Sequence, residues 1–174
     1  MTKLKIPVTD HDHRTGDQKG KVILVEYGDY ECPHCGIAHP LIKRLLKQFS
    51  HGLLFVFRNF PLQEAHPEAM ISAQAAEAAN LQNKFWEMHD IIFEHQVNLS
   101  GKSLLQDARN LHLSIDQFSR DWSSKEVISK VEADFEGGIR SGVNGTPTFF
   151  VNGIKLDSYD ASFESLADAV KNAE

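Results

Sequence analysis

Both cysteines of this chain lie in the stretch Glu26-Tyr27-Gly28-Asp29-Tyr30-Glu31-Cys32-Pro33-His34-Cys35. The apolar run Val22-Ile23-Leu24-Val25 precedes it and predicts a strand covered on both faces, while helical periodicity follows it. If Cys32 is the helix N-cap, Pro33 takes the first helical position, where its fixed φ suits a helix. Unpaired N–H groups and the positive end of the helix dipole then favour a thiolate at Cys32. The spacing therefore predicts a redox-active pair of thiols.

A metal site and an inert pair are the alternatives for these two cysteines. A tetrahedral zinc site would need two further ligands, from His34, His39, His51 or elsewhere. His34 and Cys35 cannot easily share a metal with Cys32 while they form the first helical turn. The stretch Asp10-His11-Asp12-His13 could also bind a metal, but we interpret it as a solvated loop. We therefore assign no metal ligand, and no cofactor beyond a redox-active Cys32–Cys35 disulfide.

The composition suits one globular domain that needs no disulfide to stabilise it, since 41% of the 174 residues are hydrophobic. The formal net charge is -6 with both signs interleaved, so we expect no nucleic-acid partner. No apolar stretch is long enough to insert into a membrane, and the N-terminus has no signal-peptide pattern. We expect a cytoplasmic protein, although an exported protein without its signal peptide would have a similar sequence.

The order of predicted elements is typical of an α/β protein. Residues 22–25, a helix after Cys35 and residues 53–57 form a βαβ unit. Residues 66–138 are helical, and residues 148–156 are a hairpin around the Asn152-Gly153 turn, before a last helix. We predict an irregular lead-in over residues 1–20, a βαβ-plus-ββα domain over residues 21–62 and 139–174, and an all-helical insertion over residues 63–138.

Local patterns predict details of the helices. In the first helix we expect a buried stripe that includes Ile37 and Leu45, with a kink at Pro40. Capping boxes are predicted where a serine precedes a glutamine or glutamate by three residues, at Ser114 with Gln117 and at Ser123 with Glu126.

Three features together resemble DsbA-like thioredoxin-fold thiol-disulfide oxidoreductases. They are the dithiol Cys32-Pro33-His34-Cys35, the acid Glu26 six residues before it, and Gly145-Thr146-Pro147-Thr148, which matches the segment that carries the family's cis-proline. The segments at residues 25–32, 57–62 and 142–150 resemble more narrowly the stand-alone branch, whose domain also occurs fused to sodium/proton antiporters. The resemblance covers about residues 7 to 172.

The resemblance implies a thioredoxin fold, with a four-stranded sheet whose first and third core strands are central. It implies thiol-disulfide exchange with protein or peptide substrates, and a redox partner such as thioredoxin or glutathione. Cys32 would be the exposed nucleophile and Cys35 the resolving thiol. Thr146 and Pro147 would face the dithiol and pair with an extended substrate. The direction of exchange stays open, because Thr146 resembles isomerase-type members as much as oxidases.

Two further residues have alternative interpretations. Glu26 is expected to be a partly buried base that relays protons to Cys35, or else an exposed carboxylate that ends its strand. His34 is expected to stabilise the Cys32 thiolate, or else to be an ordinary residue of the first helical turn. For the whole chain, the alternative to an enzyme is a non-catalytic module that binds peptides or a metal.

Overall fold

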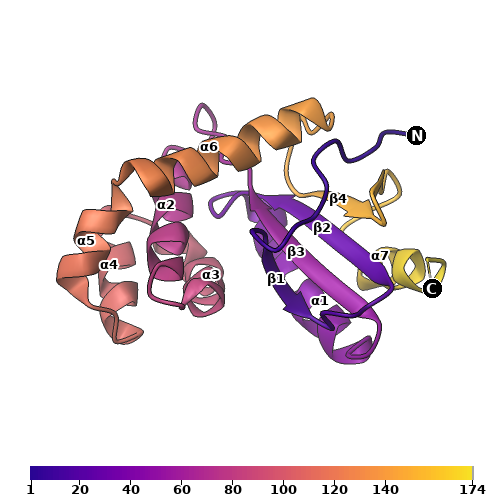
Figure 1. Ribbon diagram of the computed structural model, residues 1–174, viewed down its shortest axis with the longest axis horizontal. Coiled ribbons are helices and arrows are strands. Elements are labelled where there is room, and N and C mark those ends of the chain that lie inside the picture. Colours follow the sequence, from indigo (N-terminus) through magenta and orange to yellow (C-terminus); the bar gives the residue numbers. More distant parts are fainter. Residues whose placement is uncertain (174) are drawn as a thin grey trace.

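A computed structural model describes residues 1–173, and its centre is a five-stranded sheet in the order β1-β3-β2-β4-β5 (Figure 1). The inner strands are β3 (Leu53–Asn59), β2 (Val22–Gly28) and β4 (Thr148–Val151). β2 runs parallel to β3, as a βαβ unit requires, and antiparallel to β4. β5 (Ile154–Lys155) completes that hairpin, and positive φ at both Asn152 and Gly153 confirms the predicted two-residue turn.

The sheet has one strand more than expected, because β1 (His13–Gly16) pairs antiparallel with the outer edge of β3. The prediction of an irregular lead-in over residues 1–20 is therefore wrong at this strand. Asp12 and His13 are also not solvated: Asp12 binds the Arg58 guanidinium, and His13 Nε2 lies 2.9 Å from a Glu77 carboxylate oxygen. This strand carries polar residues, so it lacks the alternating apolar pattern that would predict a strand. The residue that pairs with the His13 side chain, Glu77, is distant in sequence.

One face of the sheet packs on α1 (Pro33–Gln48) and α7 (Phe163–Lys171). Leu24, Cys35, Leu45, Phe57 and Leu166 belong to the buried cluster between these layers. The predicted stripe of α1 is correct at Leu45, which is fully buried, and wrong at Ile37, which is 49% exposed. Pro40 lies inside the helix, which continues on both sides of it.

The opposite face of the sheet is covered by the N-terminal segment and by α6 (Lys125–Arg140). Phe60 stacks on Phe135 of this helix with 4.4 Å between ring centroids. A Cβ at Gly138 would lie 2.6 Å from the Phe60 ring, so only glycine lets α6 approach this closely. Figure 1 shows α6 reaching from the other helices back over the sheet.

The remaining helices lie beside the sheet in Figure 1 and confirm the predicted run of helices between β3 and β4. Their bounds are α2 (Ala69–Asn80), α3 (Phe85–Glu94), a 3-10 turn η1 (Gln96–Asn98), α4 (Gly101–Asn110) and α5 (Ile115–Trp122). Whether residues 63–138 form a subdomain of their own stays a prediction.

Both predicted capping boxes are wrong in detail. Ser114 is the N-cap of α5, but its side chain accepts no capping hydrogen bond; its backbone N–H donates to the Gln82 side chain instead. The N-cap of α6 is Ser124, whose hydroxyl accepts from Val127 N, and not its neighbour Ser123. At α5, the Gln82 side chain provides the partner of the Ser114 backbone N–H. At α6, the helix begins one residue later than predicted.

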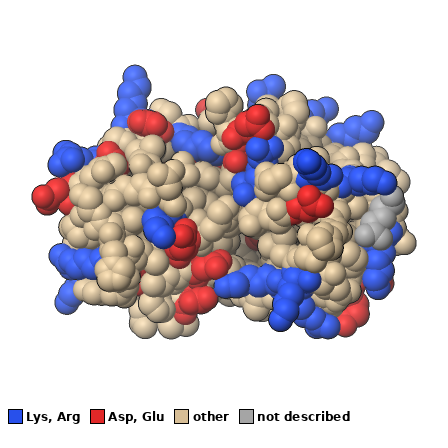
Figure 2. All heavy atoms as spheres, turned by 60° about the horizontal axis from the view of Figure 1, so that its bottom comes forward, with Lys and Arg blue, Asp and Glu red and all other residues tan. Residues whose placement is uncertain are grey.

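Acidic and basic side chains are interspersed on the face drawn in Figure 2. Across residues 1–173, no helix combines the length and the apolar character that crossing a membrane requires.

Candidate active site: the dithiol and the Thr146–Pro147 loop

The two cysteines lie at the start of α1, just after the turn that connects β2 to this helix. Cys32 is the N-cap in an extended conformation, and Pro33 follows at the first helical position, as predicted. Both cysteines are free thiols. Cys32 is 4% exposed and Cys35 is 0% exposed. Cys35 is thus the deeper of the two, but the expectation of an exposed Cys32 is wrong.

Cys32 is covered by the loop before β4. Its Sγ lies 3.3 Å from the Thr146 carbonyl oxygen, to which Cys32 donates a hydrogen bond while it is protonated. The Thr146–Pro147 peptide bond is cis. The Thr148 hydroxyl donates to the Gly145 carbonyl at 2.7 Å and closes the turn. The structure thus brings Thr146 and Pro147 to the dithiol, although Thr146 follows Cys32 by 114 residues along the chain.

The two thiols have opposite acidities. A hydrogen bond from Cys35 is the largest influence on Cys32. Together with contacts from the Thr146 side chain and from the backbone of Cys35 and His34, it lowers the pKa of Cys32 to about 5, against the opposing effect of burial. Burial first, and then the same hydrogen bond, raise the pKa of Cys35 well above its ordinary value. At neutral pH the arrangement therefore holds a thiolate at Cys32 beside a protonated Cys35.

His34 and Pro33 are exposed. The contact of His34 that lowers the pKa of Cys32 comes from its backbone. A role for the imidazole itself stays a prediction.

Glu26 lies on β2 beneath the dithiol, on the same face of the strand as Leu24 of the α1 cluster, because alternate residues share a face. It is only 3% exposed, and the strand continues past it to Gly28. The alternative of an exposed carboxylate that ends the strand is therefore wrong. Burial, and then the negative charge of Cys32, raise the pKa of Glu26 to about 8. A proton relay from Cys35 stays a prediction.

The structure adds His66 and Gln96, which the sequence did not single out. His66 Nδ1 lies 2.8 Å from Asp29 Oδ2; burial alone would lower the pKa of His66, but the hydrogen bond and charge of Asp29, with the charge of Cys32, raise it. The Gln96 amide donates to the backbone carbonyls of Tyr30 and Cys32 at 2.8 Å each. No local pattern indicates these contacts, since they join segments far apart in sequence.

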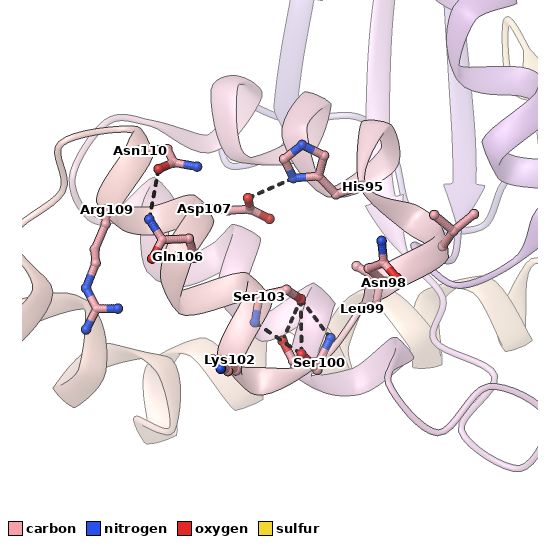
Figure 3. Close-up of a pocket in the computed structure, with 11 residues that line it drawn as sticks. His95, Asn98, Leu99, Ser100, Lys102, Ser103, Gln106, Asp107, Arg109 and Asn110 are labelled. Atoms are coloured by element: carbon pink, nitrogen blue, oxygen red, sulfur yellow. Dashed lines mark hydrogen bonds and ion pairs between the residues drawn. The ribbon is translucent and has the colours of Figure 1, made fainter.

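A cavity of about 820 Å³ opens at the junction of α3 and α4 (Figure 3). Its lining includes His95, whose Nδ1 lies 2.8 Å from Asp107 Oδ1. None of the predicted site residues lines this cavity, so its size does not make it the catalytic site.

The family model described as thioredoxin matches residues 8–172. The chain belongs to this thioredoxin family. The Na(+)/H(+) antiporter NhaA 1 of Salinispora arenicola is 42% identical over 172 residues, which are 98% of this chain and 26% of that protein. The chain thus spans about a quarter of the length of this curated relative.

Solved structures agree with the family. A thioredoxin-like oxidoreductase from Silicibacter pomeroyi has a TM-score of 0.81 and 27% identity, over 95% of this chain and 93% of that one. The thiol-disulfide exchange protein alpha-DsbA2 from Wolbachia pipientis has a TM-score of 0.79 over 94% and 87% of the two chains; at 20% identity it shows the fold alone. The thioredoxin fold is confirmed, and the likeness to DsbA-type proteins is confirmed as a likeness in fold.

Proposed function

We propose that this chain is a thiol-disulfide oxidoreductase that exchanges disulfides with protein or peptide substrates through Cys32 and Cys35. The observation that carries the proposal is the paired acidity of the thiols, with a pKa of about 5 at Cys32 and a raised pKa at Cys35. The thiolate is the nucleophile in disulfide exchange, and a buried structural cysteine would not be acidic.

In the reductive direction the Cys32 thiolate attacks one sulfur of a substrate disulfide. A mixed disulfide forms on Cys32, and the other substrate sulfur leaves as a thiolate. Cys35 then loses its proton and attacks Cys32 Sγ, which forms the Cys32–Cys35 disulfide and releases the second substrate thiol. The oxidative direction reverses these steps. The disulfide is the only redox group that the reaction needs, and a thiol partner such as thioredoxin or glutathione would restore the starting state.

Thr146 and Pro147 would guide the substrate in this proposal. Their loop lies directly over Cys32, and the space beside Gly145 is open, since a Cβ there would meet no atom within 4 Å. An extended substrate backbone could therefore approach the sulfur along this loop.

The proposal is tested by turnover in insulin reduction and in oxidative refolding of a reduced, disulfide-containing protein. The wild type should be active in at least one assay, and the Cys32→Ser/Cys35→Ser variant in neither. A non-catalytic peptide-binding module would give no turnover in either assay.

Glu26→Gln is expected to slow the step in which Cys35 resolves the mixed disulfide. Burial, the first cause of the raised pKa of Glu26, persists in the mixed disulfide, whereas the negative charge of Cys32 does not. The resolution rate of the wild type should therefore rise through an ionisation above the ordinary pKa of 4.5, and the amide variant should lack it. Stopped-flow measurement of the rate across the pH range tests this, with the exposed Glu87→Gln as the matched control.

Glu26→Gln is also expected to change how the free energy of unfolding depends on pH. The pKa of Glu26 is raised above its ordinary value of 4.5, so its contribution to folding is full below that pH and is lost as the pH rises through about 8. At alkaline pH the Glu26→Gln variant should be more stable than the wild type by on the order of a few kcal/mol. Urea unfolding at acid and alkaline pH measures this; equal pH dependence in both proteins would contradict the buried, proton-accepting role.

A further inference from the structure

A cluster of side chains that can bind a metal lies one helical turn beyond the dithiol, between α1 and α3. It consists of His39 on α1 and His89 and Asp90 on α3, each offering one ligand atom, and these atoms all lie within 4.8 Å of one another. A cavity of about 210 Å³ opens against all three residues. The residues take no part in the exchange chemistry proposed above.

The geometry around His39 indicates a missing partner. Its Nε2 is buried and makes no hydrogen bond within the described part of the chain, although it lies 3.5 Å from Asp90 Oδ1. A buried polar atom without a partner is costly, which makes each such atom a feature that needs an explanation. Two ligands of a tetrahedral zinc ion, with bonds of about 2.0–2.2 Å, stand about 3.4 Å apart. The observed separation of nitrogen and oxygen is close to that value.

The His89 ring is oriented by a hydrogen bond at Nδ1. Its Nδ1 lies 2.9 Å from the Tyr30 hydroxyl. In the tautomer in which Nδ1–H donates to this hydroxyl, the bond orients the ring and leaves the Nε2 lone pair to coordinate. Metal-binding histidines are commonly oriented through the second ring nitrogen in this way.

We propose that His39, His89 and Asp90 form a binding site for a divalent transition-metal ion of the zinc type. Two imidazoles and one carboxylate suit such an ion, whereas Mg²⁺ and Ca²⁺ prefer oxygen ligands alone. Three protein ligands leave a fourth position open toward the cavity for water or another small ligand. Closing the set around an ion requires side-chain movements on the order of 1 Å.

Lys43 supplies the positive charge at this place when no ion is bound. Its ammonium lies 2.9 Å from Asp90 Oδ2 and 3.6 Å from Glu94 Oε1. An incoming cation would compete with Lys43 for Asp90. The Lys43 side chain is half exposed, so it can turn toward Glu94 and the solvent. The site therefore predicts that removal of Lys43 tightens metal binding.

The test uses the full chain without an affinity tag, in the Cys32→Ser/Cys35→Ser background so that no thiolate binds the metal. Zn²⁺ titration by calorimetry should give one saturable site per chain, and Co²⁺ should give visible absorption typical of nitrogen and oxygen ligands. Mg²⁺ and Ca²⁺ should give no saturation. Because both thiols are absent, the result does not depend on the proposed disulfide exchange.

Variants assign the ligands. His39→Gln and Asp90→Asn should each weaken Zn²⁺ binding by at least about tenfold, since even the loss of an outer-shell partner costs that much. Lys43→Met should strengthen it. His95→Gln, which alters the other histidine-aspartate pair in Figure 3, is the matched control and should leave affinity unchanged.

Circular dichroism checks that each variant is folded, and Asp90→Asn is the safer change because Asp90 is partly exposed. The proposal is overturned if Zn²⁺ shows no saturable binding. It is equally overturned if folded Asp90→Asn binds Zn²⁺ as tightly as its parent.

Discussion

Replacement of Cys35 by serine is expected to turn the protein into a covalent trap for its substrates. With its pKa of about 5, Cys32 is almost entirely thiolate at neutral pH and can attack a substrate disulfide. The resolving thiol is then absent, so the mixed disulfide on Cys32 persists. The serine hydroxyl can still donate the hydrogen bond that Cys35 gives to Cys32, which keeps the thiolate stabilised.

Replacement of Cys32 should have the opposite result. Cys35 is completely buried, and burial is the first cause of its raised pKa, so most of the shift remains when Cys32 is gone. A buried thiol with a pKa well above neutral presents less than about a hundredth of the thiolate that Cys32 presents. Cys32→Ser is therefore expected to capture at least about a hundredfold less substrate than Cys35→Ser.

Mass spectrometry after incubation with a disulfide-containing model protein measures both variants directly. The Cys32→Ser/Cys35→Ser protein gives the background, and addition of dithiothreitol should release the captured substrate. Equal capture by the two single variants, or capture by the one that retains only Cys35, would show that the roles of the sulfurs are reversed.

The sequence predicted those parts of the fold that depend on local patterns. The apolar runs before Glu26 and after Leu53 define β2 and β3, and Asn152-Gly153 provides the two positive φ angles of its turn. The Cys32-Pro33 pair marks the start of α1, because proline at the first helical position needs no N–H partner.

The missed features depend on contacts that only the folded chain creates. β1 carries the polar residues His13 and Arg14 and shows no apolar alternation, but it pairs with an edge that β3 would otherwise leave open. Ile37 fits the helical stripe by spacing alone, yet its side chain is 49% exposed in the folded chain. Helical periodicity predicts which residues share one face of a helix. It does not predict how much of that face the neighbouring elements cover.

The candidate site divides in the same way. Cys32, Cys35, Glu26 and the Thr146–Pro147 loop were identified from short motifs, and the structure brings them together. The burial of Cys32 was not predicted, because it depends on how closely that loop lies over the sulfur.

Arg58→Met is expected to cost about 3–5 kcal/mol of folding free energy, as is typical when one partner of a buried ion pair is removed. Arg58 is 2% exposed, and its guanidinium makes five hydrogen bonds. Two of them hold both carboxylate oxygens of Asp12, at 2.7 and 3.0 Å. The others reach the Tyr27 hydroxyl and the carbonyls of Ile6 and Pro7. All five N–H donors of the side chain are thus used, and they fasten the N-terminal segment to β2 and β3.

Methionine keeps most of the volume of Arg58 but leaves the Asp12 carboxylate buried without its partner. Urea unfolding of the purified protein measures the loss. Arg14→Met is the matched control, because Arg14 pairs with the largely exposed Asp10 and such a surface pair contributes about 1 kcal/mol at most. Comparable losses in the two variants would contradict the special position given to Arg58.

A double variant separates the cost of an unpaired charge from the loss of the other hydrogen bonds. In Arg58→Met/Asp12→Leu neither buried charge remains, and apolar replacement of a buried ion pair is often nearly neutral. If the uncompensated Asp12 carboxylate causes most of the loss, the double variant should recover more than half of the stability that Arg58→Met loses. If it recovers none, the bonds to Tyr27, Ile6 and Pro7 carry the stabilisation, and the ion pair serves only to place Arg58.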